Sequence, residues 1–234
     1  MPTQQHVPNL KEKNDSRLTA SLGTPAAGNE TNYSIQAAYA ITNHFALTGG
    51  INGTYNGTDN LTTTINNVTK NFEVRYKRPS FELGAGIFYP ISKDKKVMFE
   101  TYAGYGAGKN NITEFINNVQ TNFHNSRTNR FYVQPILSFH PADFISISGS
   151  VRYNNIGYNS ITTGYTNTEL INYKLSDLSL KRIEFLEPSL AVTGGVNSVP
   201  WLRLQTQLTS VNLLSGVNIN YRVPFLSLAV QIDP

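Results

Sequence analysis

Apolar and polar residues alternate along most of this chain. Between residues 33 and 153, the odd-numbered positions of successive segments are apolar, and the even-numbered positions are polar or small. Leu47 and Ile51 share the odd parity, whereas Thr48 and Asn52 share the even one. Because successive side chains of a β-strand point to opposite faces, this pattern predicts strands with one apolar and one polar face.

The alternation and the turn residues that interrupt it predict ten strands. Helix is disfavoured, because Gly, Asn, Thr and β-branched residues occur throughout and no period of about 3.6 residues is sustained. The expected strands are Arg17–Leu22, Tyr33–Ile41, Phe45–Tyr55, Tyr76–Tyr89, Val97–Gly108, Asn129–Phe139, Phe144–Asn154, Ile183–Thr193, Trp201–Ser210 and Pro224–Ile232.

Short and long connections alternate between these segments. The short ones are Thr42–His44, Pro90–Lys96, His140–Asp143 and Gly194–Pro200, and the longest of the others is Asn155–Arg182. Short turns at one rim and long loops at the other are typical of outer-membrane barrels, in which the short turns are periplasmic. The long loops, rich in Asn, Thr and Tyr, are expected to extend the strands beyond the membrane as hairpins.

The expected fold is therefore all-β: a closed antiparallel up-and-down transmembrane β-barrel of about ten strands. Aromatic residues at both ends of the apolar faces suggest two interfacial girdles. After residue 182 the apolar parity changes from odd to even. Residues expected to face lipid are Leu83, Ile87, Ile147, Val151, Leu190, Leu204, Leu228 and Val230.

Composition fits this class of protein. Charged residues make up only 15% of the chain, below the roughly 25% of typical soluble domains. Cysteine is absent, and the net charge of +4 comes from scattered residues, which argues against a nucleic-acid partner. The chain resembles the small outer-membrane β-barrel proteins of Gram-negative bacteria, and its Asn- and Tyr-rich loops look like those of Bacteroidota examples. The resemblance implies a bacterial outer-membrane location.

The parity opposite to the apolar face places charged residues inside the barrel. Acidic and basic members are nearly balanced, so we expect them to form a salt-bridged network in a filled lumen rather than a wide pore. Large inward side chains are expected to fit beside inward glycines. The predicted network consists of Arg17, Glu82, Glu100, Arg152, Glu187 and Arg203.

Two units are expected: residues 1–16 as an N-terminal periplasmic tether or short plug, and residues 17–232 as one barrel domain. The expected partners are outer-membrane lipid and a surface or periplasmic protein. No cofactor or metal is expected, since the histidines lack metal-ligand spacing. Ser138, His140 and Asp143 are residue types of a catalytic triad, but they span a strand end and a turn, so no enzymatic activity is predicted.

Three alternatives remain open at the level of sequence. A soluble or lipid-anchored barrel of the lipocalin type would turn its apolar face inward around a small ligand. A narrow channel would be lined by Glu82, Glu100, Arg152 and Arg203. An outer-membrane lipid-modifying enzyme would need loop residues in a register that the sequence does not fix.

Overall fold

The computed structural model describes residues 4–25, 29–65, 68–172, 175–176, 178–214 and 224–233. Ten strands close into an antiparallel barrel, as the sequence predicts. Neighbours around the wall are also neighbours along the chain, and the last barrel strand pairs with the first over Leu18–Pro25. In wall order the strands are β1 (Ser16–Pro25), β2 (Asn29–Ala40), β3 (Phe45–Ile65), β5 (Ser80–Pro90), β6 (Val97–Ile116), β7 (Val119–Ala142), β8 (Ile145–Thr163), β9 (Ile183–Val196), β10 (Val199–Thr209) and β12 (Phe225–Ile232).

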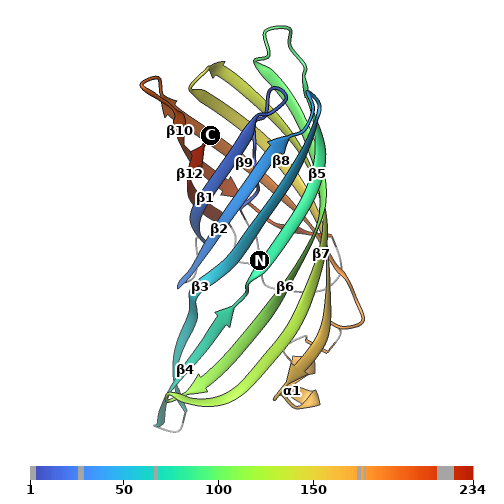
Figure 1. Cartoon of the computed structure of the whole chain (residues 1–234). Helices are drawn as coiled ribbons and strands as arrows, with labels where there is room; N and C mark the ends of the chain where they lie inside the picture. Colours follow the sequence, from blue (N-terminus) through green and yellow to red (C-terminus); the bar gives the residue numbers. More distant parts are fainter. Residues whose placement is uncertain are drawn as a thin grey trace.

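The strands differ greatly in length, and this difference shapes the molecule. Strand β7 has 24 residues, whereas β12 has 8. The long strands continue past the barrel as a curved sheet, which lies at the end opposite the short turns (Figure 1). Strand β4 (Val68–Lys77) belongs to this extension, where it pairs with β3 and β6. The expected loops after β3 and β6 are thus hairpins of this projecting sheet.

A short helix, α1 (Asn167–Asn172), interrupts the connection between β8 and β9. The strand pattern did not predict this helix, which begins with a capping box. Thr166 Oγ1 accepts a hydrogen bond from the Glu169 backbone N–H, and the Glu169 carboxylate accepts one from the Thr166 backbone N–H at 2.7 Å. These hydrogen bonds lower the pKa of Glu169. Strand β11 (Asn212–Leu213) then adds a short pairing to β9.

The outer face of the barrel is apolar. All of the residues expected to face lipid are exposed on it, from Val151 with 40% to Leu204 with 65% of its surface accessible. On the opposite face of the same strands, charged and amide side chains such as Glu82, Arg152, Glu187 and Gln205 are buried inside. This polarity is opposite to that of the lipocalin-type alternative, which is therefore wrong. Among the described residues, no helix is long and apolar enough to cross a membrane.

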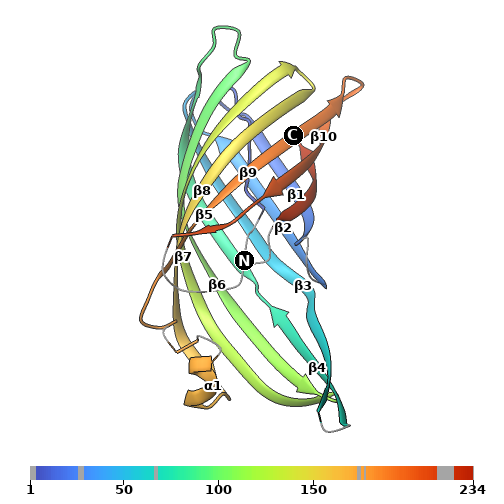
Figure 2. The same cartoon turned by 180° about the vertical axis from the view of Figure 1, so that it is seen from behind.

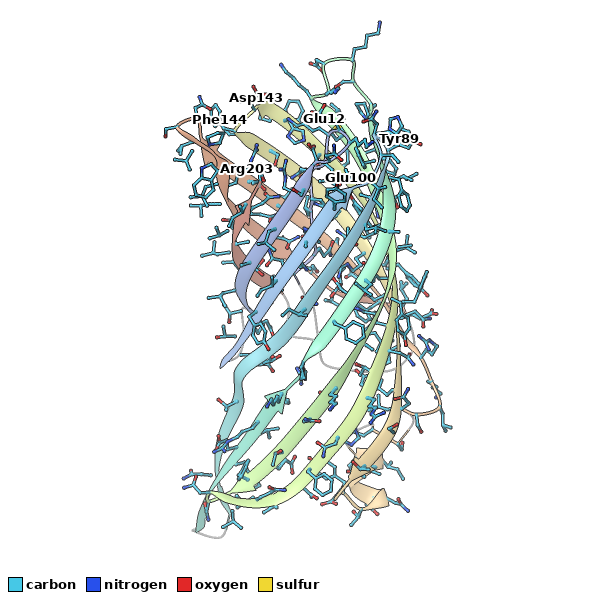
Figure 3. All side chains as sticks on the ribbon, in the orientation of Figure 1. Glu12, Tyr89, Glu100, Asp143, Phe144 and Arg203 are labelled. Carbon is cyan, nitrogen blue, oxygen red and sulfur yellow. The ribbon has the colours of Figure 1, made fainter. Side chains whose placement is uncertain are left out.

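Aromatic residues border the apolar surface at both ends. Tyr33, Phe81, Tyr105 and Phe131 lie toward the projecting sheet, and Tyr39, Phe45, Tyr89 and Phe139 lie toward the short turns; all are exposed. Tyr89 marks the second group in Figure 3. Amphipathic rings prefer the membrane interfaces, so the two groups mark the expected borders of the hydrocarbon layer.

The outward assignment is testable by placing a charge on the apolar surface. We expect Val151→Arg and Leu204→Arg to impair assembly, because a cation near the bilayer midplane costs about 2–4 kcal/mol. Membrane fractionation and the mobility shift between boiled and unboiled gel samples would measure assembly. Val119→Arg is the matched control, because Val119 is exposed in the β6–β7 hairpin of the projecting sheet. Normal assembly of both test variants would contradict the orientation.

Candidate functional site in the lumen

The centre of the lumen holds a cluster of buried charges. Glu82 on β5 accepts a hydrogen bond from Arg130 on β7, and Arg152 Nη1 on β8 lies 3.6 Å from the Glu82 carboxylate. Arg152 also donates to Gln134 Oε1 at 2.8 Å, and its guanidinium lies 4.7 Å from the centre of the Tyr132 ring. A carboxylate between two guanidiniums stabilises both arginines in a region away from bulk water.

Glu187 extends this cluster to the next strand. It lies opposite Arg152 in the β8–β9 register, and its carboxylate accepts a hydrogen bond from Asn154 Nδ2 at 2.8 Å. Both Arg152 and Glu187 are fully buried. The cluster thus joins strands from opposite parts of the wall across the interior of the barrel.

Glycines create the space for large inward side chains. A methyl group added at Gly84 or Gly104 would lie about 2.5 Å or less from the Tyr132 side chain. One added at Gly86 would lie 2.4 Å from the ring of Tyr102. This matches the predicted packing of small beside large inward residues, and it places the two tyrosine side chains against glycines of neighbouring strands.

A second group of charges lies at the short-turn rim. Asp233, just after β12, forms ion pairs with Arg17 on β1 at 2.8 Å and with Arg203 on β10 at 3.0 Å. Arg203 also donates to the carbonyl of Asp143 at 3.1 Å, and both residues lie near this rim in Figure 3. Asp233 therefore connects the two strands that flank β12 and reinforces the closure of the barrel.

The predicted network is thus divided. Glu82, Arg152 and Glu187 belong to the central cluster, whereas Arg17 and Arg203 meet at the rim through Asp233. Glu100, fully buried, accepts a hydrogen bond from Tyr102 Oη at 2.7 Å and interacts electrostatically with Arg17 of the rim group. A single shared network was expected, but the barrel is tall enough to hold inward charges at separate levels.

Residues of the N-terminal segment lie inside the barrel. Residues 4–10 are buried, and Glu12 lies at the short-turn rim, so the segment leads from the lumen to the start of β1 (Figure 3). Figure 2 shows the barrel wall from behind, with β8, β9 and β10 nearest to the viewer. Whether the segment acts as a tether or as a plug depends on what residues 4–10 contact inside this wall.

A small cavity lies beside the segment. A cavity of about 10 Å³ lies between His6, Glu82, Tyr102, Tyr132 and Arg152. Such a volume holds about one water molecule. No group of three metal-ligating side chains occurs in the part of the chain that the structure describes. Ser138, from the triad of residue types noted in the sequence, shares a hydrogen bond with Ser148.

Sequence reasoning missed two members of these clusters. Arg130 has the same parity as Tyr132 and Gln134, so its inward position was available from the pattern. Asp233 follows the last strand, where the alternation ends, and nothing in the pattern indicated that it would turn back onto two arginines. The path of residues 4–10 has no sequence signal, because this segment follows no strand or helix period.

Several solved structures are similar to this chain. The translocator domain of the autotransporter NalP from Neisseria meningitidis matches with a TM-score of 0.50 and 10% identity, over 93% of this chain and 86% of that one. The KdgM porin matches with a TM-score of 0.44 and 9% identity, over 93% and 98%. An outer-membrane channel from Pseudomonas putida F1 matches with a TM-score of 0.42 and 8% identity, over 97% and 99%.

No protein-family model and no curated protein sequence matches the chain. The architecture is that of outer-membrane β-barrel proteins, and the predicted bacterial outer-membrane location is supported by this fold together with the apolar outer face. The Bacteroidota-like origin stays a prediction.

The central cluster is expected to stabilise the barrel. Arg152→Leu removes a cation from Glu82 and Glu187, and breaking a buried ion pair typically costs about 3–5 kcal/mol. Removing Glu82 as well, as Leu, should cost less than the sum of the two single changes, because each single change removes the same contact between Arg152 and Glu82. Urea unfolding of the refolded barrel in detergent would measure all three variants.

The exposed pair Glu73 and Arg75 on β4 provides the control. Their carboxylate and guanidinium lie 2.6 Å apart on the projecting sheet, where the hydrogen bond from Arg75 lowers the pKa of Glu73. Arg75→Leu should change stability little, because water replaces the lost contact. Equal effects of Arg152→Leu and Arg75→Leu would show that the central cluster adds no more than a surface pair.

Proposed function

We propose that this protein is an outer-membrane barrel with a closed lumen, which acts through its surface rather than by transport or catalysis. The observation that carries the proposal is the position of residues 4–10. These residues are buried inside the barrel and hydrogen-bonded to inward side chains of its wall, such as Gln36 and Gln134. A segment held in this way acts as a plug instead of a free tether.

The central charges support the same proposal. The contact between Arg152 and Glu82 extends from β8 to β5, and Tyr132 fills the space above Gly84 and Gly104. A barrel of about eight strands is only just wide enough for its own side chains, and the ten strands of this barrel leave additional width that the N-terminal segment occupies. The plug and the charge cluster together leave a void of water size in this region.

The projecting sheet is the proposed interaction surface. It extends beyond the expected membrane region (Figure 1) and carries exposed apolar residues, including Val119 at its tip and Leu180 in the connection after α1. Surfaces built on loops and hairpins above a rigid barrel are positioned to contact other molecules. The proposed partners are outer-membrane lipid around the belt and a surface or periplasmic protein beyond it.

Conductance in planar bilayers tests the closed lumen. We expect no stepwise conductance from the whole chain, because the plug and the charge cluster block the path of ions. A variant lacking residues 2–10 should show conductance steps, since only side chains then remain in the lumen. The boiled and unboiled gel shift should be the same for both proteins, which controls for folding.

Two other conductance results would contradict the proposal. Stable conductance by the whole chain would favour the narrow channel lined by Glu82, Glu100, Arg152 and Arg203. A deletion variant that folds but does not conduct would show that the N-terminal segment is not the element that closes the lumen.

A further inference from the structure

The wall of the lumen contacts the backbone of the N-terminal segment at regular intervals. The carbonyl of Gln4 accepts a hydrogen bond from Gln36 Nε2, and that of His6 accepts one from Gln134 Nε2, both at 2.9 Å. The carbonyl of Pro8 accepts one from Arg17 Nε at 3.0 Å. Every second carbonyl is thus bound by a side chain, and these donors come from β2, β7 and β1.

Side chains of the segment follow a row of serines on β8. Ser150 Oγ donates to Gln5 Oε1 at 2.7 Å, and Gln5 Nε2 donates to the backbone carbonyl of Glu187. Four residues later, the amide of Asn9 contacts the hydroxyls of Ser146 and Ser148, each at 3.3 Å. The segment therefore runs antiparallel to β8 along a row of small polar residues at alternate positions.

Apolar contacts anchor the end of the segment nearer to the rim. Val7 and Leu10 are almost completely buried in a cluster that includes Phe88, Met98 and Ile136. Asn9 between them has a φ of 55°, in the left-handed region that asparagine tolerates well. This turn directs Leu10 into the apolar cluster before the chain leaves the lumen.

These contacts have the form of a peptide-binding site. Side-chain donors to alternate carbonyls recognise an extended backbone, the serine row accepts amide side chains, and the apolar cluster selects one aliphatic residue. None of residues 4–10 is Lys, Arg, Asp or Glu, so the segment adds no carboxylate, ammonium or guanidinium group to the charges of the lumen. Pro8 lacks a backbone N–H and so leaves no donor unpaired at that position.

We propose that the lumen is a binding site for an extended, uncharged peptide, which the chain's own residues 4–10 occupy and which accepts the same sequence as a separate molecule. This inference rests on the proposed closed lumen, because it takes the plug to be a ligand of the wall. The peptide class is defined by a glutamine, an asparagine four residues later and a leucine directly after it.

An exchange experiment on the folded protein tests this site. A specific protease sequence inserted between Glu12 and Lys13, in the turn at the rim, allows the plug to be separated after the barrel has folded. A fluorescent peptide of residues 1–12 should then replace the cleaved segment, with saturable binding of one peptide per barrel followed by fluorescence anisotropy. The gel shift between boiled and unboiled samples confirms that the cleaved barrel stays folded.

Two substitutions, one in the peptide and one in the wall, show whether the observed contacts account for peptide binding. A peptide with Leu10→Asp should bind at least about tenfold more weakly, because it would bury a carboxylate among apolar side chains. On the wall, Gln36→Leu should weaken binding of the unchanged peptide about fivefold, the effect of one lost hydrogen bond.

The outcomes separate this inference from the proposed function. If the cleaved, folded barrel conducts ions but binds no peptide, the peptide site is refuted and the closed lumen of the whole chain stands. Equal binding of the Leu10→Asp peptide would also refute the site, because the anchor would then have no role. If the barrel lacking residues 2–10 folds without conducting, the proposed plug is refuted, whether or not the cleaved barrel binds the fluorescent peptide.

Discussion

The pairing of β12 with β1 is the interaction on which the rest of this structure depends. In a lipid environment an unpaired strand edge leaves backbone N–H and C=O groups without partners, at a cost of several kcal/mol for each group. The pairing of Leu18–Pro25 with the last strand removes that edge, although β12 has only 8 residues. Asp233 adds ion pairs to the strands on both sides of it. Closure in turn fixes which face of every strand points inward.

Once the apolar face points to lipid, the side chains of the polar face must find their hydrogen-bond and ion-pair partners within a narrow lumen. Water is scarce there, so Arg152 and Glu82 are stabilised by each other and by amide, hydroxyl and ring neighbours. The N-terminal segment supplies further hydrogen-bond partners for the polar side chains of this inner face. It brings backbone carbonyls to wall donors such as Gln134. The segment therefore fills part of the lumen and at the same time satisfies some of the polar groups of its wall.

Much of this arrangement follows from parity alone. Alternation gave the ten barrel strands, the outward position of Leu204 and the inward position of Glu82, because a period of two residues assigns each side chain to a face. Parity does not give the height of a residue along the barrel, which depends on strand tilt and register. For this reason Glu82 and Arg203 were placed in one network, whereas the structure separates them into a central and a rim cluster.

The N-terminal segment shows where periodicity stops being informative. The wall that surrounds the segment determines its conformation. A short segment that buries no apolar core of its own does not offset the conformational entropy it loses when it becomes ordered. The inward parity of Gln36 and Gln134 was visible in the sequence, but each amide carries an acceptor as well as donors, so the pattern did not show that these donors would bind the backbone carbonyls of residues 4–10. The alternation therefore predicted which wall residues point inward and not which segment they bind.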